Sequence, residues 1–225
     1  MDRLQDCAKA FEHLLDTTYH IVIGRKGNTA TIDLAFKAEH FHHLLGMHKL
    51  RDIEALSHKR EKVFDDILAG HISFSDIEKS CSFGEIEGRV DPLTNMENIL
   101  DDNRLIFRYN KRANSFSLIH AEYLLSTDYN QDTVFIFLDK MGNGDQFFCR
   151  SFFPKTGRDY TEGQARYALL YKEKVRISTG ERIVQLDKLS PKKENFTAQI
   201  IAEAEQEASE LLAQKPEAPA RGQHR

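Results

Sequence analysis

Four histidines occur close together in the stretch TIDLAFKAEHFHHLLGMHKL, which covers Thr31–Leu50. All four lie within a span of nine positions: His40, His42, His43 and His48. Histidine is the side chain whose ordinary pKa lies nearest neutrality, and its imidazole is also a common metal ligand. The cluster therefore indicates either proton transfer or metal binding.

Three interpretations of the cluster follow from its spacing. His40 and His43 at i and i+3 could share a zinc ion with His48 folded back, but His42 points elsewhere and neither an HExxH nor a CxxC motif accompanies them. The histidines could instead be exposed or capping residues around a hydrophobic turn. The third possibility is that one of them, most plausibly His43, acts as a general acid or base.

A second stretch that could do chemistry is RSFFPKTGRDYTEGQ, from Arg150 to Gln164. It offers cations, hydroxyl groups and an amide where a strand gives way to a loop, and such groups suit an anionic ligand. The same residues would also fit an ordinary loop followed by a helix capped at Thr161. The functional interpretation requires this stretch and the histidine cluster to meet in space.

The elements that position the histidines are predicted from periodicity. We expect an N-terminal helix over 2–15, then a hairpin of strands 19–23 and 29–36. A short helix over 37–45 should end at Gly46, with His43 exposed opposite the apolar face and Glu39 one turn before it. Helical patterns continue through the middle of the chain, over 52–56, 60–68, 75–79 and 96–100.

The later half of the chain changes to strand-like segments separated by short turns, over 104–109, 116–125, 133–138, 146–153 and 167–177. Their spacing predicts an antiparallel meander. The fold class is therefore α+β, with a meander packed against helices in a single domain over 1–190. An Ala- and Glu-rich helix over 191–214 and a disordered tail over 215–225 should follow.

The composition agrees with a folded protein that has no transmembrane helix. The 225 residues are 40% hydrophobic, no apolar run reaches 18 residues, and no signal peptide is evident. Three dispersed cysteines without a CxxC pair predict reduced thiols and a cytoplasmic location. The net charge is −4, but the segment from Lys140 to Lys188 carries +4, so a local surface could bind phosphate.

Taken together, the two stretches resemble a known family. The resemblance rests on Phe36, Phe41, His43, Leu44, Leu45, Gly46, Lys49 and Leu50, and later on Ser151–Pro154, Asp159–Thr161, Gln164 and Leu169–Lys174. This pattern is similar to the fourth group of phage-associated nucleases in the barnase–EndoU–colicin–RelE-like superfamily. It covers roughly residues 15–185, without the C-terminal helix and tail.

The resemblance implies an α+β fold and a metal-independent endoribonuclease that acts as a toxin or an effector of a mobile element. It implies His43 as the general acid or base. Two further sets follow from it: site-lining residues Ser151, Tyr160, Thr161 and Gln164, and phosphate-binding residues Lys49, Arg150, Lys172 and Lys174. RNA is cleaved without metal when its own 2′-OH attacks the adjacent phosphate, and Tyr160 would be the second proton carrier.

Three functions remain open on the sequence alone. The first is the RNA-cleaving enzyme without a cofactor, with RNA as its partner, no membrane contact, and a protein inhibitor as a possible partner of the C-terminal helix. The second is a non-catalytic module of the same fold that binds nucleic acid or protein. The third is a metal-dependent hydrolase built on the histidine cluster.

Overall fold

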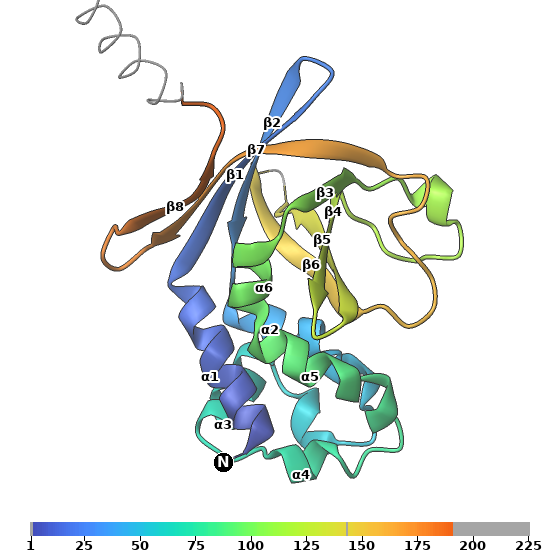
Figure 1. Ribbon diagram of the computed structural model, residues 1–225. Helices are drawn as coiled ribbons and strands as arrows, with labels where there is room; N and C mark the ends of the chain where they lie inside the picture. The colour runs from blue at the N-terminus through green and yellow to red at the C-terminus, as the bar shows by residue number, and fades with distance from the viewer. Residues whose placement is uncertain (1, 143, 191–225) are drawn as a thin grey trace, which may run out of the picture. The chain divides into compact units, whose positions relative to one another are not determined.

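Seven strands close into a barrel in the order β1-β2-β6-β5-β4-β3-β7, because β1 and β7 also pair with each other (Figure 1). The computed structural model describes residues 2–142 and 144–190, and Met1–Asp187 form one compact unit. The strands are β1 (Thr17–Arg25), β2 (Asn28–Ala35), β3 (Leu105–Arg108), β4 (Tyr123–Tyr129), β5 (Asp132–Lys140), β6 (Gln146–Pro154), β7 (Ala165–Arg176) and β8 (Arg182–Asp187). Strand β8 pairs only with β7, outside the ring.

The closed barrel corrects the prediction of a simple antiparallel meander. Strands β3 to β6 do pair antiparallel in chain order. However, the N-terminal hairpin completes the ring, because β2 pairs in parallel with β6 while β1 pairs with β7. The twelve-residue β7 is long enough to pair with β1 along one part of its length and with β3 along the other. Such long-range pairing leaves no local pattern in the sequence.

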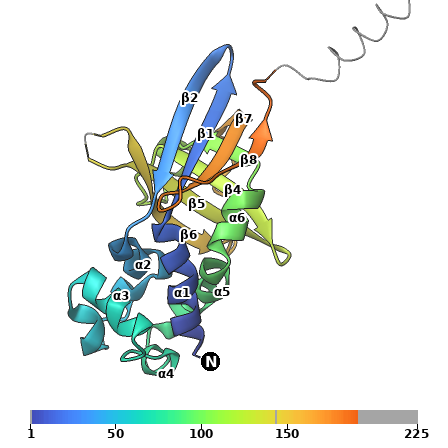
Figure 2. The same cartoon turned by 90° about the vertical axis from the view of Figure 1, so that its left-hand side faces the viewer.

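The helices confirm the expected helical first half. They are α1 (Arg3–Leu15), α2 (Ala38–Leu45), α3 (Arg60–Leu68), α4 (Phe74–Ile77), α5 (Glu87–Thr94) and α6 (Met96–Asp102). Short 3-10 turns occur at Met47–Lys49, Glu54–Ser57, Phe83–Glu85 and Lys111–Asn114. Helices α1 to α5 gather at one end of the barrel, whereas α6 runs up its side toward β3 (Figures 1 and 2). The buried rings of Phe11, Phe41 and Phe64 pack together between α1, α2 and α3.

Two elements were missed and one was misplaced. Helix α5 carries Pro92 in its interior, which argued against a helix, and β8 is a mostly exposed edge strand. The strand expected over 116–125 begins only at Tyr123, and its turn falls at Asn130 and Gln131, both with positive φ. Residues between Lys111 and Ala121 instead form a 3-10 turn and an irregular segment.

The expected C-terminal helix over 191–214 and the tail over 215–225 lie outside the described residues. Among the residues that are described, no helix is both long and apolar enough to cross a membrane.

Candidate functional site

Helix α2 carries the histidines, and its C-terminal end is fixed by Gly46. This residue adopts φ 88°, the left-handed conformation that favours glycine, and its N–H donates to the carbonyl of His43. A Cβ at Gly46 would lie 2.9 Å from Cγ2 of Ile86, so a larger residue would also clash with the start of α5. Since Phe41, Leu44 and Leu45 are fully buried, the opposite side of α2 is left to face the barrel.

The four histidines have different environments. His40 accepts a hydrogen bond at Nδ1 from the Lys37 N–H (3.1 Å), so it caps the start of the helix. His42 is buried, with Nε2 3.4 Å from the Leu56 carbonyl oxygen. His43 is half-buried and stacks on the exposed His48, with ring centroids 4.9 Å apart. Within residues 2–142 and 144–190, no three His, Cys, Asp or Glu side chains are arranged to hold a metal ion.

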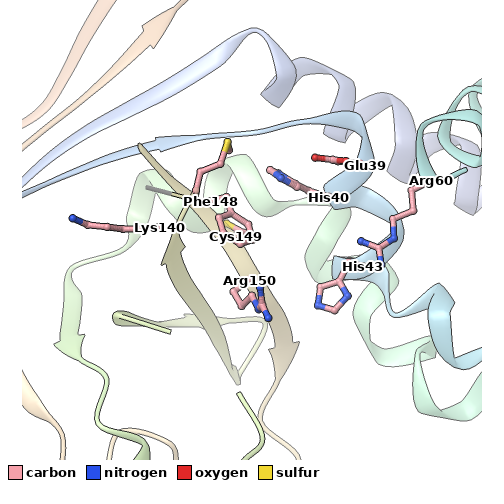
Figure 3. Close-up of a pocket in the computed structure, with 10 residues that line it drawn as sticks. Glu39, His40, His43, Arg60, Lys140, Phe148, Cys149 and Arg150 are labelled. Atoms are coloured by element: carbon pink, nitrogen blue, oxygen red, sulfur yellow. The ribbon is translucent and has the colours of Figure 1, made fainter. Parts of the chain in front are cut away.

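His43 and Arg150 stand between two adjoining clefts and line both of them. The first cleft, about 440 Å³, also includes Glu39, Arg60 and Lys140 (Figure 3). Figure 3 shows the His43 ring on α2 and the Arg150 side chain on β6 on opposite sides of this cleft. The second cleft, about 550 Å³, brings several predicted site residues together: Lys49, Ser151 and Tyr160, with His48 and Arg89. The two motifs therefore meet in space.

The surroundings of His43 are positively charged. Burial lowers the pKa of the His43 imidazole below its ordinary value of 6.5, and the positive charges of Arg60, Arg150 and Arg89 lower it further. A hydrogen bond to the Arg150 backbone acts in the opposite direction. The predicted carboxylate neighbour, Glu39, lines the first cleft, but within the described chain no ion pair joins it to His43. His43 is therefore held mainly in its neutral form at pH 7.

Arg89 is a site residue that the sequence did not reveal. Its guanidinium donates to the Leu44 carbonyl (3.3 Å) and lies 5.6 Å from the centre of the Phe153 ring. These contacts hold the side chain at the cleft wall, and among the described residues it forms no ion pair, although the charge of Glu85 acts on it. Arg89 lies on α5, a helix that was not predicted because Pro92 lies in its interior. The sequence alone therefore did not place Arg89 at the site.

Ser151 and Tyr160 come from the second motif, on opposite sides of the Pro154 loop. Ser151 lies on β6 beside Arg150, while the Tyr160 ring packs 5.4 Å from each of Phe135, Phe137 and Phe153. Aromatic contacts on several sides restrict the ring to one orientation. Both residues line the second cleft.

Thr161 and Gln164 do not line either cleft. The Thr161 hydroxyl and N–H donate to Asp159 at 2.6 and 2.8 Å, which closes a local turn. The Gln164 amide accepts from the Asn110 N–H (2.7 Å) and donates to the Asn110 carbonyl (3.2 Å). These two residues shape the loop that carries Tyr160 and fix it to the 3-10 turn after β3.

Lys172 and Lys174 are also remote from both clefts, because they lie on the part of β7 that faces α6. Lys172 is 1% exposed and donates to the carbonyls of Leu100, Asp101 and Asn103 at the end of α6. Lys174 pairs with Glu97 and Asp101. Of the predicted phosphate-binding residues, the structure brings only Arg150 and Lys49 to the clefts, and Lys49 also pairs with Glu85 (3.1 Å).

The fold and the site together define an α+β barrel protein with a histidine in a cleft rich in arginine. The chain belongs to the family described as phage-Barnase-EndoU-ColicinE5/D-RelE like nuclease 4, whose sequence model matches residues 3–189. This confirms the resemblance and places the chain among nucleases of the barnase, EndoU, colicin and RelE type. Neither a curated protein nor a solved structure gives a significant match to the chain.

Proposed function

We propose that this protein is a metal-independent endoribonuclease that cleaves RNA by attack of the 2′-OH on the adjacent phosphate. The observation that carries the proposal is the position of His43, which meets Arg150, Arg89 and Tyr160 in one cleft whose lining residues include no carboxylate. Family membership supports nuclease chemistry, and the charge of the cleft supports binding of a phosphate.

His43 is suited to be the general base. A base must be unprotonated before the reaction, and the lowered pKa of His43 meets this requirement at neutral pH. In the proposed step His43 takes the proton of the 2′-OH, the 2′-oxygen forms a bond to phosphorus, and the bond from phosphorus to the 5′-oxygen breaks. The products are a 2′,3′-cyclic phosphate and a free 5′-OH.

Tyr160 is the proposed general acid that protonates the leaving 5′-oxygen. A phenolic O–H can donate a proton to a leaving oxygen, which is what a general acid must do. The ring packs against three phenylalanines, of which Phe153 also lines the cleft, and these contacts restrict the direction of the hydroxyl. His48, stacked on His43, is less suited, because partial loss of solvent around its ring lowers its pKa to about 4.

Arg150, Arg89 and Lys49 would balance the charge that develops on the phosphate. Arg89 is already fixed by the Leu44 carbonyl and the Phe153 ring, so little reorganisation is required when the transition state forms. Each preorganised donor of this kind contributes about 3–4 kcal/mol to transition-state stabilisation. Ser151 lines the same cleft and would donate a further hydrogen bond to a phosphate oxygen.

The direct test compares cleavage of a mixed-sequence RNA by the wild-type chain and by His43→Ala, both in EDTA, with cyclic-phosphate ends detected by mass spectrometry. We expect the rate to fall by about 10³-fold, within the range for loss of a general base. His13→Ala is the matched control. His13 is an exposed histidine on α1, so this variant should cleave RNA at the wild-type rate. Absence of cyclic-phosphate ends with wild-type protein would refute the proposal.

A toxin role is part of the same proposal. Endoribonuclease activity of broad sequence tolerance would arrest growth when the chain is produced in bacterial cells. We expect induction of the wild-type gene, but not of the His43→Ala form, to stop growth and leave RNA fragments with cyclic-phosphate ends. Equal arrest by both forms at equal protein levels would separate toxicity from the proposed chemistry.

A further inference from the structure

A third cleft adjoins the catalytic one and is not used by the chemistry proposed above. It measures about 480 Å³, and its lining includes the cations Arg108 and Lys111 together with His120. His120 also lines the second cleft, beside Tyr160 and Arg150. The third cleft therefore adjoins the catalytic cleft at His120.

The wall between these two clefts has the chemistry of a nucleotide contact. His120 Nε2 lies 3.1 Å from the Lys111 ammonium, and no carboxylate lines the third cleft. Arg108 is partly balanced by Glu122 (2.8 Å), which leaves Lys111 as the cation with the less neutralised charge. Because an ammonium only donates, His120 Nε2 accepts from Lys111, and a phosphate beside Lys111 would gain a charge-assisted donor from its remaining N–H groups.

The segment before His120 carries exposed apolar side chains. Leu118, which lines the second cleft together with His120, is 88% exposed, and Phe116 is 45% exposed; both lie on the irregular segment that follows the 3-10 turn. Arg158 covers the Phe116 ring with its guanidinium 4.0 Å from the centre. Leu118, beside His120, therefore offers an exposed apolar contact for a base that is not stacked on its neighbours.

The wall is held rigidly in place. The Gln164 amide bonds both backbone groups of Asn110, and the Asn110 side chain accepts from the Arg112 N–H (3.0 Å). The Asn114 amide donates to the Tyr160 carbonyl (3.0 Å), which ties the same turn to the loop of the general acid. Thus the third cleft and Tyr160 are positioned by one connected set of hydrogen bonds.

We propose that the cleft of Arg108, Lys111 and His120 binds the phosphate of a neighbouring nucleotide, with its base against Leu118, so that the substrate is single-stranded RNA. The inference rests on the proposed function, because it takes the scissile phosphate to lie at His43. A duplex would keep its bases stacked and could not place one against Leu118. Gln164 then helps to position the substrate by holding Asn110, and it takes no part in the chemical step.

The test measures binding of 2′-O-methyl RNA, which cannot be cleaved, to the full chain by fluorescence anisotropy. Lys111→Gln should weaken binding of an eight-nucleotide strand about tenfold and leave a dinucleotide unaffected. The slope of log K against log salt should fall by about 0.7, the value for one lost phosphate contact on a single strand. Arg112→Gln is the matched control, because it removes the same charge one residue away, outside this cleft.

The possible outcomes separate the two proposals. If Lys111→Gln binds the long strand as tightly as wild type, or weakens both lengths equally, the third cleft is not a subsite. If an eight-base-pair duplex binds as tightly as the single strand, the single-strand requirement is wrong. If the length-dependent loss is found but no RNA is ever cleaved, the subsite stands and the catalytic proposal fails. If His43-dependent cleavage occurs while Lys111→Gln cleaves the long strand normally, the catalytic proposal stands and the subsite is refuted.

Discussion

Arg150 on β6 and Lys172 on β7 were both predicted to bind phosphate, but the structure gives them different surroundings. Arg150 is exposed, lines two clefts, and has no ion pair within the described chain. Lys172 is buried and its ammonium is bound to three carbonyls at the end of α6. A positive charge therefore indicates a phosphate site only when its donors are not already used by the fold. The comparison separates cations that serve substrate from cations that serve stability.

The largest effect should follow from Arg150→Gln. Removing the guanidinium should lower kcat on RNA by about 10²–10³-fold, because a positioned donor to the transition state contributes about 3–4 kcal/mol. Stability should change little, since Arg150 is exposed and the described residues give it no ion pair. Steady-state cleavage and thermal unfolding of the same preparation measure the two effects. A large loss of stability with normal kcat would show that Arg150 serves the fold and not the substrate.

Lys172→Met should show the opposite pattern. The substitution removes three hydrogen bonds of a buried ammonium, at about 1 kcal/mol each, which should lower the free energy of unfolding by about 3 kcal/mol. The three carbonyls keep a second donor, from the Asn103 N–H or the Arg104 guanidinium. Cleavage per folded molecule should remain at the wild-type rate, because Lys172 contacts neither cleft. Urea unfolding followed by far-UV circular dichroism gives the first quantity, and initial rates at a temperature where the variant is fully folded give the second. A hundredfold loss of kcat in folded protein would restore Lys172 to the site.

The histidine motif illustrates how far the sequence could go. Apolar spacing located α2, Gly46 marked its end, and the apolar positions Phe41, Leu44 and Leu45 placed His43 on the opposite side of the helix. His43 was expected to be exposed, but its ring is half-buried because that side of α2 faces the barrel. These are local properties, so one sequence contains them. The closure of the barrel through β1 and β7 depends on pairing across about 150 residues, which no local pattern encodes.

The remaining site residues were missed for two physical reasons. Arg89 lies on a helix that contains an interior proline, so the local rule argued against its element. The cleft of Lys111 and His120 depends on an irregular segment that was predicted as a strand, and β propensity cannot distinguish the two without the partner strand. The position of Lys172 and Lys174 away from the clefts could not be predicted, because their partners on α6 lie about 70 residues away in the chain.

Lys174→Met should be milder than Lys172→Met and should depend on pH. Lys174 bridges Glu97 and Asp101, whose side chains are about a quarter exposed, so we expect a loss of about 2 kcal/mol at neutral pH. Burial raises the pKa of Asp101, but hydrogen bonds from Lys174 and Tyr19 outweigh it and hold that pKa below its ordinary value.

The sign of the pH dependence follows from that lowered pKa. A carboxylate with a depressed folded pKa adds stability above its unfolded pKa, and this stability is lost as the pH falls through the folded value. The difference between wild type and Lys174→Met should therefore be fully present at pH 7 and shrink below about pH 4. Urea unfolding across this range measures it. A difference that stays constant in acid would show that Lys174 acts through packing alone.

The smallest effect concerns Arg60, which affects His43 only through its charge. Because a neighbouring positive charge disfavours the imidazolium, Arg60→Gln should raise the pKa of His43 toward 6.5, and the acidic limb of the kcat/KM profile should move to higher pH with it. Histidine Cε1 proton shifts followed by NMR measure the same pKa without requiring turnover. Lys59→Gln removes an equal charge one residue earlier and should leave both readouts unchanged, because Lys59 does not line the cleft. If the NMR titration of His43 moves but the kinetic limb does not, the limb belongs to another group, and His43 is not the base.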